Sequence, residues 1–183
     1  MDLDRYREPL RDPAALAERR AALLDQLGWL ADEVAALAPL LAGLPAWALE
    51  GAPLPGDRSL KETLVYLARL DREVYPGWIA RLEAEERPAL VPTGAEPEEG
   101  ANARDPGSGP GQGLDALVED VRSARAALVA RVGALSEEVW AREATLEDAP
   151  VTLYDLLLRV VRHDADVLRA LAYRLHEAQL TGS

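Results

Sequence analysis

Length, composition and charge limit what this chain can be. Its 183 residues are enough for one domain with a hydrophobic core, and 49% hydrophobic with 28% charged residues is not the composition of a disordered chain. A formal net charge of −12, from 32 acidic against 20 basic residues, argues against binding to nucleic acid or to anionic membranes, and the lack of cysteine excludes disulfides and thiolate chemistry.

No targeting or membrane signal is evident in the sequence. The N-terminus lacks a charged segment followed by an apolar one, and no stretch reaches about 18 uninterrupted apolar residues. We therefore expect a cytoplasmic protein without membrane association, folded as a single domain over residues 1–183. Residues 1–11 have no clear period and are expected to form an N-terminal arm.

The first predicted helix begins at a clear start signal. Asp12 is a good N-cap, and Pro13 occupies the first helical position, where its missing N–H costs nothing. Leucines and valines then recur at spacings of three, four and seven up to about Ala38, and Pro39 is expected to interrupt the helix. Residues 40–58 should form a distorted turn followed by a connection rich in Gly and Pro.

The second helix is expected from Ser59 to about Glu86. It opens with Ser59-Leu60-Lys61-Glu62, a capping box in which the hydroxyl and the carboxylate satisfy free backbone N–H groups reciprocally. Asp71 falls in the middle of its apolar face, and Pro76-Gly77 predicts a kink or a loosened turn.

Residues 87–113 change to a composition of Pro, Gly, Glu and Ala without periodicity. A loop this long inside one domain is usually functional or disordered, and we expect a flexible crossover loop. A linker between two domains is the lesser alternative, because neither side alone shows a complete helical core.

Two further long helices follow the loop. One spans about 114–135, and Ser136 caps a short helix that ends near Trp140. The last helix opens with Thr152-Leu153-Tyr154-Asp155, a variant capping box, and runs to about Ala178. With no convincing strand, the pattern predicts an all-α fold, a four-helix bundle.

Two carboxylates on apolar helix faces, Asp71 and Asp164, are the most informative single residues. Burying an unpaired charge is costly, so each should be paired, protonated, bound to a metal or close to a wet cavity. The alternative is that the helices are rotated from the ideal pattern and that both groups reach solvent or an arginine. His163, at the edge of the same face as Asp164, is either a hydrogen-bonded structural residue or a ligand, whereas His176 is expected to be solvated.

Several segments together resemble the DinB/YfiT-like superfamily. They are residues 59–68, residues 135–140, and residues 151–157 leading into His163-Asp164-Ala165-Asp166-Val167-Leu168-Arg169. The segments occur in the family's order and at suitable separations from the first helix to the last. The resemblance implies a four-helix bundle, with the long loop crossing between its second and third helices.

The resemblance also implies where a metal would bind. Many members hold a divalent metal through one histidine on the second helix and two ligands four residues apart on the last, and these positions fall on Tyr66, His163 and Val167. The tryptophan that the family often has before the second helix is Arg58 here. Valine has no donor atom and a neutral phenol is a poor ligand, so we expect a divergent member without the usual histidine triad, with no metal and no cofactor.

Three functional hypotheses remain open. In the first, a small molecule binds in the cavity between the helices, and Tyr66 and His163 act as hydrogen-bonding or acid-base groups near Asp71 or Asp164. In the second, the bundle is not catalytic and serves dimerisation or protein interaction, with Val167 as the product of repacking. In the third, the chain retains the metal- or thiol-dependent transferase or hydrolase chemistry of related proteins. A homodimer is expected from the resemblance, and the sequence leaves open whether the protein is an enzyme.

Overall fold

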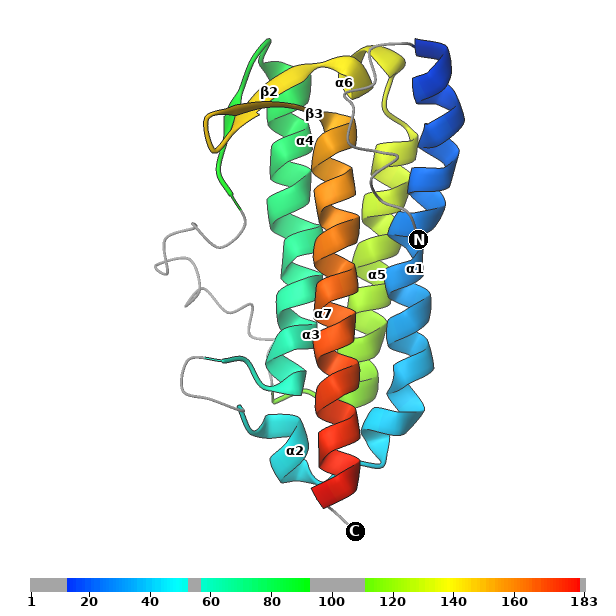
Figure 1. The fold of residues 1–183 in the computed structure, drawn as a ribbon, viewed down its shortest axis with the longest axis vertical. Coiled ribbons are helices and arrows are strands. Elements are labelled where there is room, and N and C mark those ends of the chain that lie inside the picture. Colours follow the sequence, from blue (N-terminus) through cyan, green and yellow to red (C-terminus); the bar gives the residue numbers. More distant parts are fainter. Residues whose placement is uncertain (1–12, 53–56, 93–110, 182–183) are drawn as a thin grey trace.

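Four long helical segments form an elongated bundle, with a small sheet at one end (Figure 1). The computed structural model describes residues 13–52, 57–92 and 111–181. In chain order the elements are α1 Pro13–Ala42, α2 Ala46–Glu50, α3 Leu60–Arg69, the π-helical turn Leu70–Val74, α4 Tyr75–Ala84, β1 Ala89–Leu90, α5 Leu114–Gly133, α6 Glu137–Ala141, β2 Glu143–Leu146, β3 Ala149–Thr152 and α7 Leu153–Thr181. The predicted four-helix bundle is confirmed, and α3 to α4 forms its second helix.

The bundle closes around the apolar faces expected from the sequence. Helix α1 packs against α5 and α7, and α3 packs against α5. Each of these helices buries its apolar face against its neighbours. The buried side chains that the helical period predicts are Leu23, Leu27, Leu30, Val34, Leu60, Leu64, Leu67, Leu70, Val74, Trp78, Leu117, Val121, Leu128, Val132, Leu135, Leu153, Val160, Leu171 and Leu175. Burial of this aliphatic surface is the main source of the bundle's stability.

The caps predicted at Ser59 and Thr152 are in place, whereas the predicted cap Asp12 lies outside the described residues. The Glu62 backbone N–H donates to Ser59 Oγ at 3.1 Å, and the Ser59 N–H donates to Glu62 Oε2 at 2.8 Å, which completes the capping box of α3. At the start of α7 the Thr152 N–H donates to Asp155 Oδ2 at 2.8 Å, and the Asp155 N–H donates back to Thr152 Oγ1 at 3.3 Å. These caps fix where the two helices that carry the site begin.

The interruption predicted at Pro39 is wrong. Helix α1 continues through Pro39 to Ala42. A proline inside a helix costs about 3 kcal/mol, through one lost hydrogen bond and a steric clash. Leu41 lies in the extra turn and is 2% exposed, in an apolar cluster with Leu60 and Leu171. Burial of this side chain offsets part of the cost of the proline.

The disturbance expected near Pro76-Gly77 takes the form of a π-helical turn. Pro76 has no N–H to donate to the carbonyl four residues earlier, and its ring crowds that carbonyl. In the turn just before it, the Tyr75 N–H donates to Leu70 O, five residues back in place of the usual four. The helix continues in the same direction into α4. The wider turn contains Asp71, the carboxylate that interrupts the apolar face.

The expectation of no strand is wrong. β1, β2 and β3 form a three-stranded sheet in that order, with β1 parallel to β2 and β2 antiparallel to β3. Each strand has at most four residues, too few for a period of two to be recognised, and β1 joins β2 from more than fifty residues away. The pairing is therefore a tertiary contact that a local pattern does not contain.

β1 also lies within the first part of the predicted crossover loop, 87–113, so the loop begins with ordered structure. The Trp78 Nε1–H donates to Val91 O at 2.9 Å and ties this segment to α4. The remainder of the loop, 93–110, and the predicted arm, 1–11, lie outside the described residues. Among the described helices, none combines the length and apolarity needed to cross a membrane.

Candidate functional site

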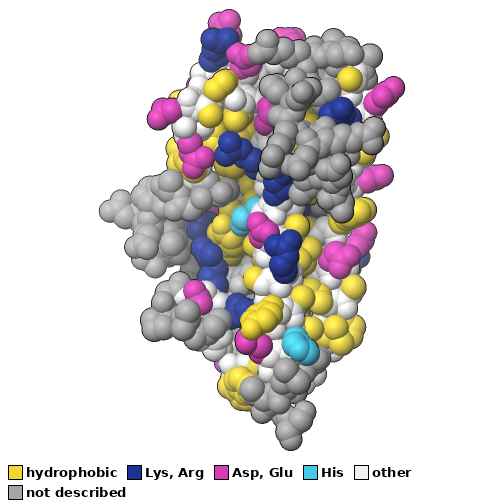
Figure 2. All heavy atoms as spheres, in the orientation of Figure 1, with side chains coloured by type: hydrophobic (Ala, Val, Ile, Leu, Met, Phe, Trp, Pro, Cys, Tyr) yellow, Lys and Arg dark blue, Asp and Glu magenta, His cyan; other side chains and the backbone are white. Residues whose placement is uncertain are grey.

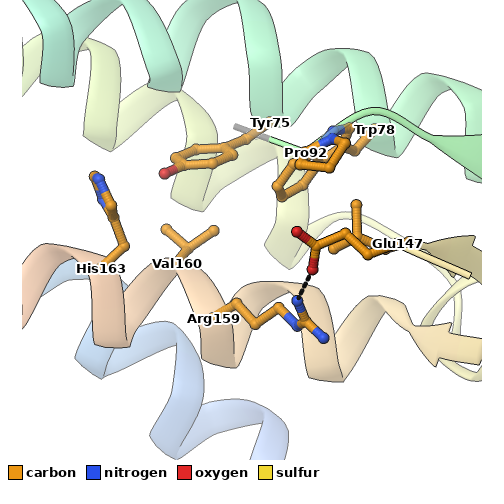
Figure 3. Close-up of a pocket in the computed structure, with 8 residues that line it drawn as sticks. Tyr75, Trp78, Pro92, Glu147, Arg159, Val160 and His163 are labelled. Carbon is orange, nitrogen blue, oxygen red and sulfur yellow. Dashed lines mark hydrogen bonds and ion pairs between the residues drawn. The ribbon is translucent and has the colours of Figure 1, made fainter. Parts of the chain in front are cut away.

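A pocket of about 220 Å³ lies between α4, the β2–β3 turn and α7. Its lining residues are Tyr75, Trp78, Pro92, Leu146, Glu147, Arg159, Val160 and His163. Figure 3 shows His163 at one end and the ion pair between Glu147 and Arg159, at 3.3 Å, at the other, with Val160 between them. The pocket therefore has an aromatic and aliphatic body with one polar group or pair at each end.

His163 is the sequence-predicted residue that enters this pocket. Its side chain is 30% exposed, and its Nδ1 atom is buried without a hydrogen-bond partner among the described residues. The nearest carboxylate oxygen that pairs with it, Asp164 Oδ1, is 3.8 Å from Nδ1, beyond hydrogen-bond distance. The imidazole thus keeps an unused hydrogen-bonding position beside the pocket.

Tyr66, the second predicted residue, packs beside His163. The two rings meet edge to face, with centroids 5.8 Å apart and planes at 64°. The guanidinium carbon of Arg58 lies 3.8 Å from the centroid of the Tyr66 ring, a cation–π contact. The structure therefore places Arg58, Tyr66 and His163 in a row along one side of the bundle.

The two carboxylates on apolar faces are joined by a buried arginine. Arg125 on α5 donates from Nε to Asp71 Oδ2 at 2.8 Å, and from Nη1 and Nη2 to Asp164 at 2.5 and 3.2 Å. Its Nη1 also donates to Leu27 O on α1 at 3.1 Å. The network connects all four helical segments of the bundle. Of the alternatives weighed from the sequence, pairing with arginine is the one observed.

Burial governs the protonation of this network. Desolvation raises the pKa of Asp71 to about 6, although the charge and hydrogen bond of Arg125 act to lower it. Burial disfavours the charged form of Arg125, but the two carboxylates outweigh it and hold the pKa of the guanidinium above its usual value. Asp71 Oδ1 has no hydrogen-bond partner in the described part of the chain, which agrees with a carboxyl that retains a proton more readily than usual.

The sequence analysis missed Arg125 and Tyr75. Arg125 lies between Val121 and Leu128 on the apolar face of its helix, the same signal that singled out the two aspartates. Tyr75 follows Asp71 by four residues on one helix face, and its hydroxyl points toward the His163 end of the pocket in Figure 3. Burial raises the pKa of the Tyr75 phenol, so it stays protonated and can donate a hydrogen bond.

The positions implied as metal ligands offer few donors. Tyr66 and His163 are neighbours, but Val167, four residues after His163, packs against two apolar clusters. In the described ranges no group of three or more His, Cys, Asp and Glu side chains is arranged to hold a metal ion. One imidazole, one phenol and one aliphatic side chain do not fit a centre that needs three or four ligands.

Comparison with known proteins identifies the family. Residues 30–169 match the DinB superfamily. The solved structure of YfiT from Bacillus subtilis, described as a probable metal-dependent hydrolase with an unusual four-helix bundle topology, is similar with a TM-score of 0.67. That similarity covers 87% of each chain at 14% sequence identity. Comparison with curated protein sequences finds no match. With most of its length matched to one family and a bundle of the same type, this chain belongs to the DinB superfamily.

Proposed function

We propose that this DinB superfamily protein binds a small molecule in the pocket beside His163, without the metal centre implied by the family resemblance. The single observation that carries the proposal is the 220 Å³ pocket that the His163 imidazole, 30% exposed, lines at one end. A ligand in the pocket can reach the exposed part of this ring. One hydrogen bond to it would contribute about 0.5–1.5 kcal/mol to binding.

The shape and lining of the pocket support the same proposal. Tyr75 and Trp78 form a tilted aromatic pair with centroids 5.3 Å apart, and Val160 and Leu146 add aliphatic surface. Small-molecule sites are typically apolar and aromatic pockets with a few polar groups that orient the ligand. His163 at one end and Glu147 with Arg159 at the other are such groups.

The donor set supports the absence of the family metal. A divalent ion at these positions would receive one imidazole nitrogen from His163, a phenol from Tyr66 and nothing from Val167. The hydrolase activity ascribed to YfiT is therefore not the activity we propose here. Any reaction on the bound molecule would depend on His163, Tyr66 and Tyr75 as proton-holding groups. The cytoplasmic location stays a prediction from the sequence.

Ligand-observed NMR with a library of small aromatic and aliphatic molecules tests the proposal. We expect binding that His163→Leu weakens about tenfold, the effect of losing one hydrogen bond worth about 1.4 kcal/mol. His176→Leu is the matched control, because His176 is exposed on the same helix, away from the pocket lining. Val160→Phe, which narrows the pocket, should also weaken binding. Equal affinities for all these folded variants would refute the site.

Elemental analysis of protein purified without chelators tests the second half of the proposal. We expect less than stoichiometric zinc, nickel or other divalent metal, and no increase in thermal stability when these metals are added. One tightly bound metal per chain would overturn the proposed loss of the centre.

Exposed apolar side chains favour a second candidate function, self-association as a homodimer. Leu40, Trp47 and Tyr173 are 48%, 60% and 63% exposed. They lie on α1, α2 and α7 at the end of the bundle opposite the sheet, and Figure 2 shows hydrophobic side chains gathered on the lower part of the visible face. Sedimentation velocity of the wild type and of Trp47→Glu tests this candidate. A monomer in both samples would refute it.

A further inference from the structure

Beside the pocket, the side chains of Arg58, Tyr66 and His163 contact one another in sequence. Arg58, at the start of α3, covers the face of the Tyr66 ring, and the edge contact of Tyr66 with His163 leads to the pocket. The three side chains come from two helical segments, and each contacts the next. A cation is thereby held against the aromatic ring that contacts His163.

Arg58 is unusual among the basic residues of this acidic protein. Within residues 13–52, 57–92 and 111–181, Arg58 and Arg162 have neither an ion pair nor a hydrogen bond, whereas most other basic side chains donate to carboxylates or carbonyl oxygens. Arg162 directly precedes His163 on α7. In a chain of net charge −12, carboxylates are abundant, so an arginine without an ion pair beside the site has charge available for a ligand.

The charges around the site favour an anion over a cation. Arg58, Arg159 and Arg162 are positive, and Glu147 already pairs with Arg159. The buried Asp71, Arg125 and Asp164 behind His163 carry at most one net negative charge, because two carboxylates share one guanidinium. Figure 2 shows Lys and Arg side chains gathered beside a recessed histidine and hydrophobic side chains on this face.

From these contacts we infer that the site takes a small molecule with an apolar or aromatic body and an anionic group. The body fills the pocket between Tyr75 and Trp78, and the carboxylate or phosphate accepts hydrogen bonds from the Arg58 guanidinium and from the His163 ring N–H. Tyr66 holds the guanidinium flat and pre-oriented, which lowers the entropy lost when the anion binds. This inference rests on the proposed function and adds the chemical class of the ligand.

Four probes that share one ring test the inference on the full-length protein: benzoate, phenyl phosphate, benzyl alcohol and benzylamine. Affinities are measured by chemical-shift titration at one ionic strength. We expect benzoate or phenyl phosphate to bind about tenfold more tightly than benzyl alcohol, because the anion gains one partly exposed charge-assisted hydrogen bond. Benzylamine, which is a cation, should bind most weakly. The stronger of the two anions identifies the headgroup chemistry.

Variants assign the preference to Arg58. Arg58→Gln should reduce the ratio of the affinity for the preferred anion to the affinity for benzyl alcohol from about tenfold to about one, while Arg58→Lys, which retains the charge but not the planar stack, should restore part of it. Arg122→Gln is the matched control, since Arg122 is an exposed arginine on α5 that pairs with Glu119. Circular dichroism confirms that each variant is folded.

The outcomes separate this inference from the proposed function. If the anions and benzyl alcohol bind equally to the wild type, or if Arg58→Gln leaves the preference intact, the anionic class is wrong and the pocket still stands as a binding site. If no probe causes shifts at the pocket, both the inference and the proposed function are overturned.

Discussion

Two neighbouring residues of α7, His163 and Asp164, belong to regions with opposite character. Asp164 points into the interior, where Arg125 binds it through two nitrogens and joins it to Asp71. His163, turned by about 100° on the helix, lies at the pocket with a buried nitrogen that no described residue satisfies. A step of one residue, less than a third of a helical turn, therefore separates a nearly saturated ion network from an unsaturated site.

The difference distinguishes polar side chains that stabilise the fold from a polar side chain that is available to a ligand. The sequence places the two aspartates as charges on apolar faces. In the structure Arg125 pairs with both of them, and this one arginine links four helical segments. His163, by contrast, retains unused hydrogen-bonding capacity beside a cavity. In this bundle the saturated charges join the helices, and the unsaturated ring lies at the pocket where we propose that a ligand binds.

The largest expected loss of stability comes from breaking the ion network. Arg125→Met leaves two carboxylates buried without a partner and should lower the free energy of unfolding by about 3–5 kcal/mol, measured by urea denaturation. Arg131→Met on the same helix is the control, because Arg131 and Glu83 form an exposed pair and its loss should cost less than about 1 kcal/mol.

The same network offers a rescue experiment. Replacing all three members, with Asp71→Leu, Arg125→Met and Asp164→Leu, removes the uncompensated charges and should recover most of the stability lost by Arg125→Met alone. A triple variant as unstable as the single one would show that the ion network does more than satisfy its own charges.

The second prediction concerns the pH dependence of stability. Folding raises the pKa of Asp71 from 3.8 to about 6, so the folded state binds a proton more tightly than the unfolded state. This stabilisation is fully present below pH 3.8 and is lost as the pH rises through 6, a change of about 3 kcal/mol.

Asp71→Asn separates the pH-dependent stabilisation due to Asp71 from that due to the other carboxyl groups. The stability difference, wild type minus variant, should fall between about pH 4 and pH 6 and level off above it. Arg125, Asp164 and Arg72 are the charged groups that act on Asp71 and are unchanged in both proteins. Parallel stability curves across this range would contradict the shifted pKa.

The third prediction concerns the positions that correspond to the family's metal ligands. Tyr66→His together with Val167→His should create a three-histidine zinc site with His163, because Tyr66 contacts His163 and Val167 follows it by one helical turn. Zinc at 100 times its Kd should then stabilise the variant by about 2.7 kcal/mol in a thermal unfolding assay. The same pair of substitutions with His163→Ala is the control. A folded double variant without zinc affinity would count against the correspondence with the family's ligand positions.

The smallest expected effect lies in the turn that brings Glu147 to the pocket. Glu147 and Asp148 have φ angles of 52° and 62°, a conformation that favours glycine, and Glu147 pairs with Arg159 at the pocket. Asp148→Gly should raise stability by about 1 kcal/mol and the Tm by about 2–4 °C. Asp148→Ala keeps the unfavourable φ and should give no gain; a gain as large as that of glycine would mean the turn is unstrained.

Local signals predicted the helices well and the small sheet poorly. The capping boxes at Ser59 and Thr152 identified two helix starts, because a cap is formed by residues three apart in sequence. The sheet was missed because β1 and β2 pair across a long separation with few residues each. The prediction at Pro39 was wrong because a local penalty says nothing of tertiary contacts such as the burial of Leu41, which offsets part of it.

Helical period and capping are encoded within a few residues, so the sequence predicted the all-α bundle, its family and the polar residues on its apolar faces. The resemblance also placed Tyr66 and His163 in one site, and their rings do meet. The folded structure was needed to show that Arg125 pairs with both Asp71 and Asp164 and that Arg58 stacks on Tyr66. Such pairings depend on how whole helices pack against one another, and the period of a single helix carries no information about which residue of another helix it will face.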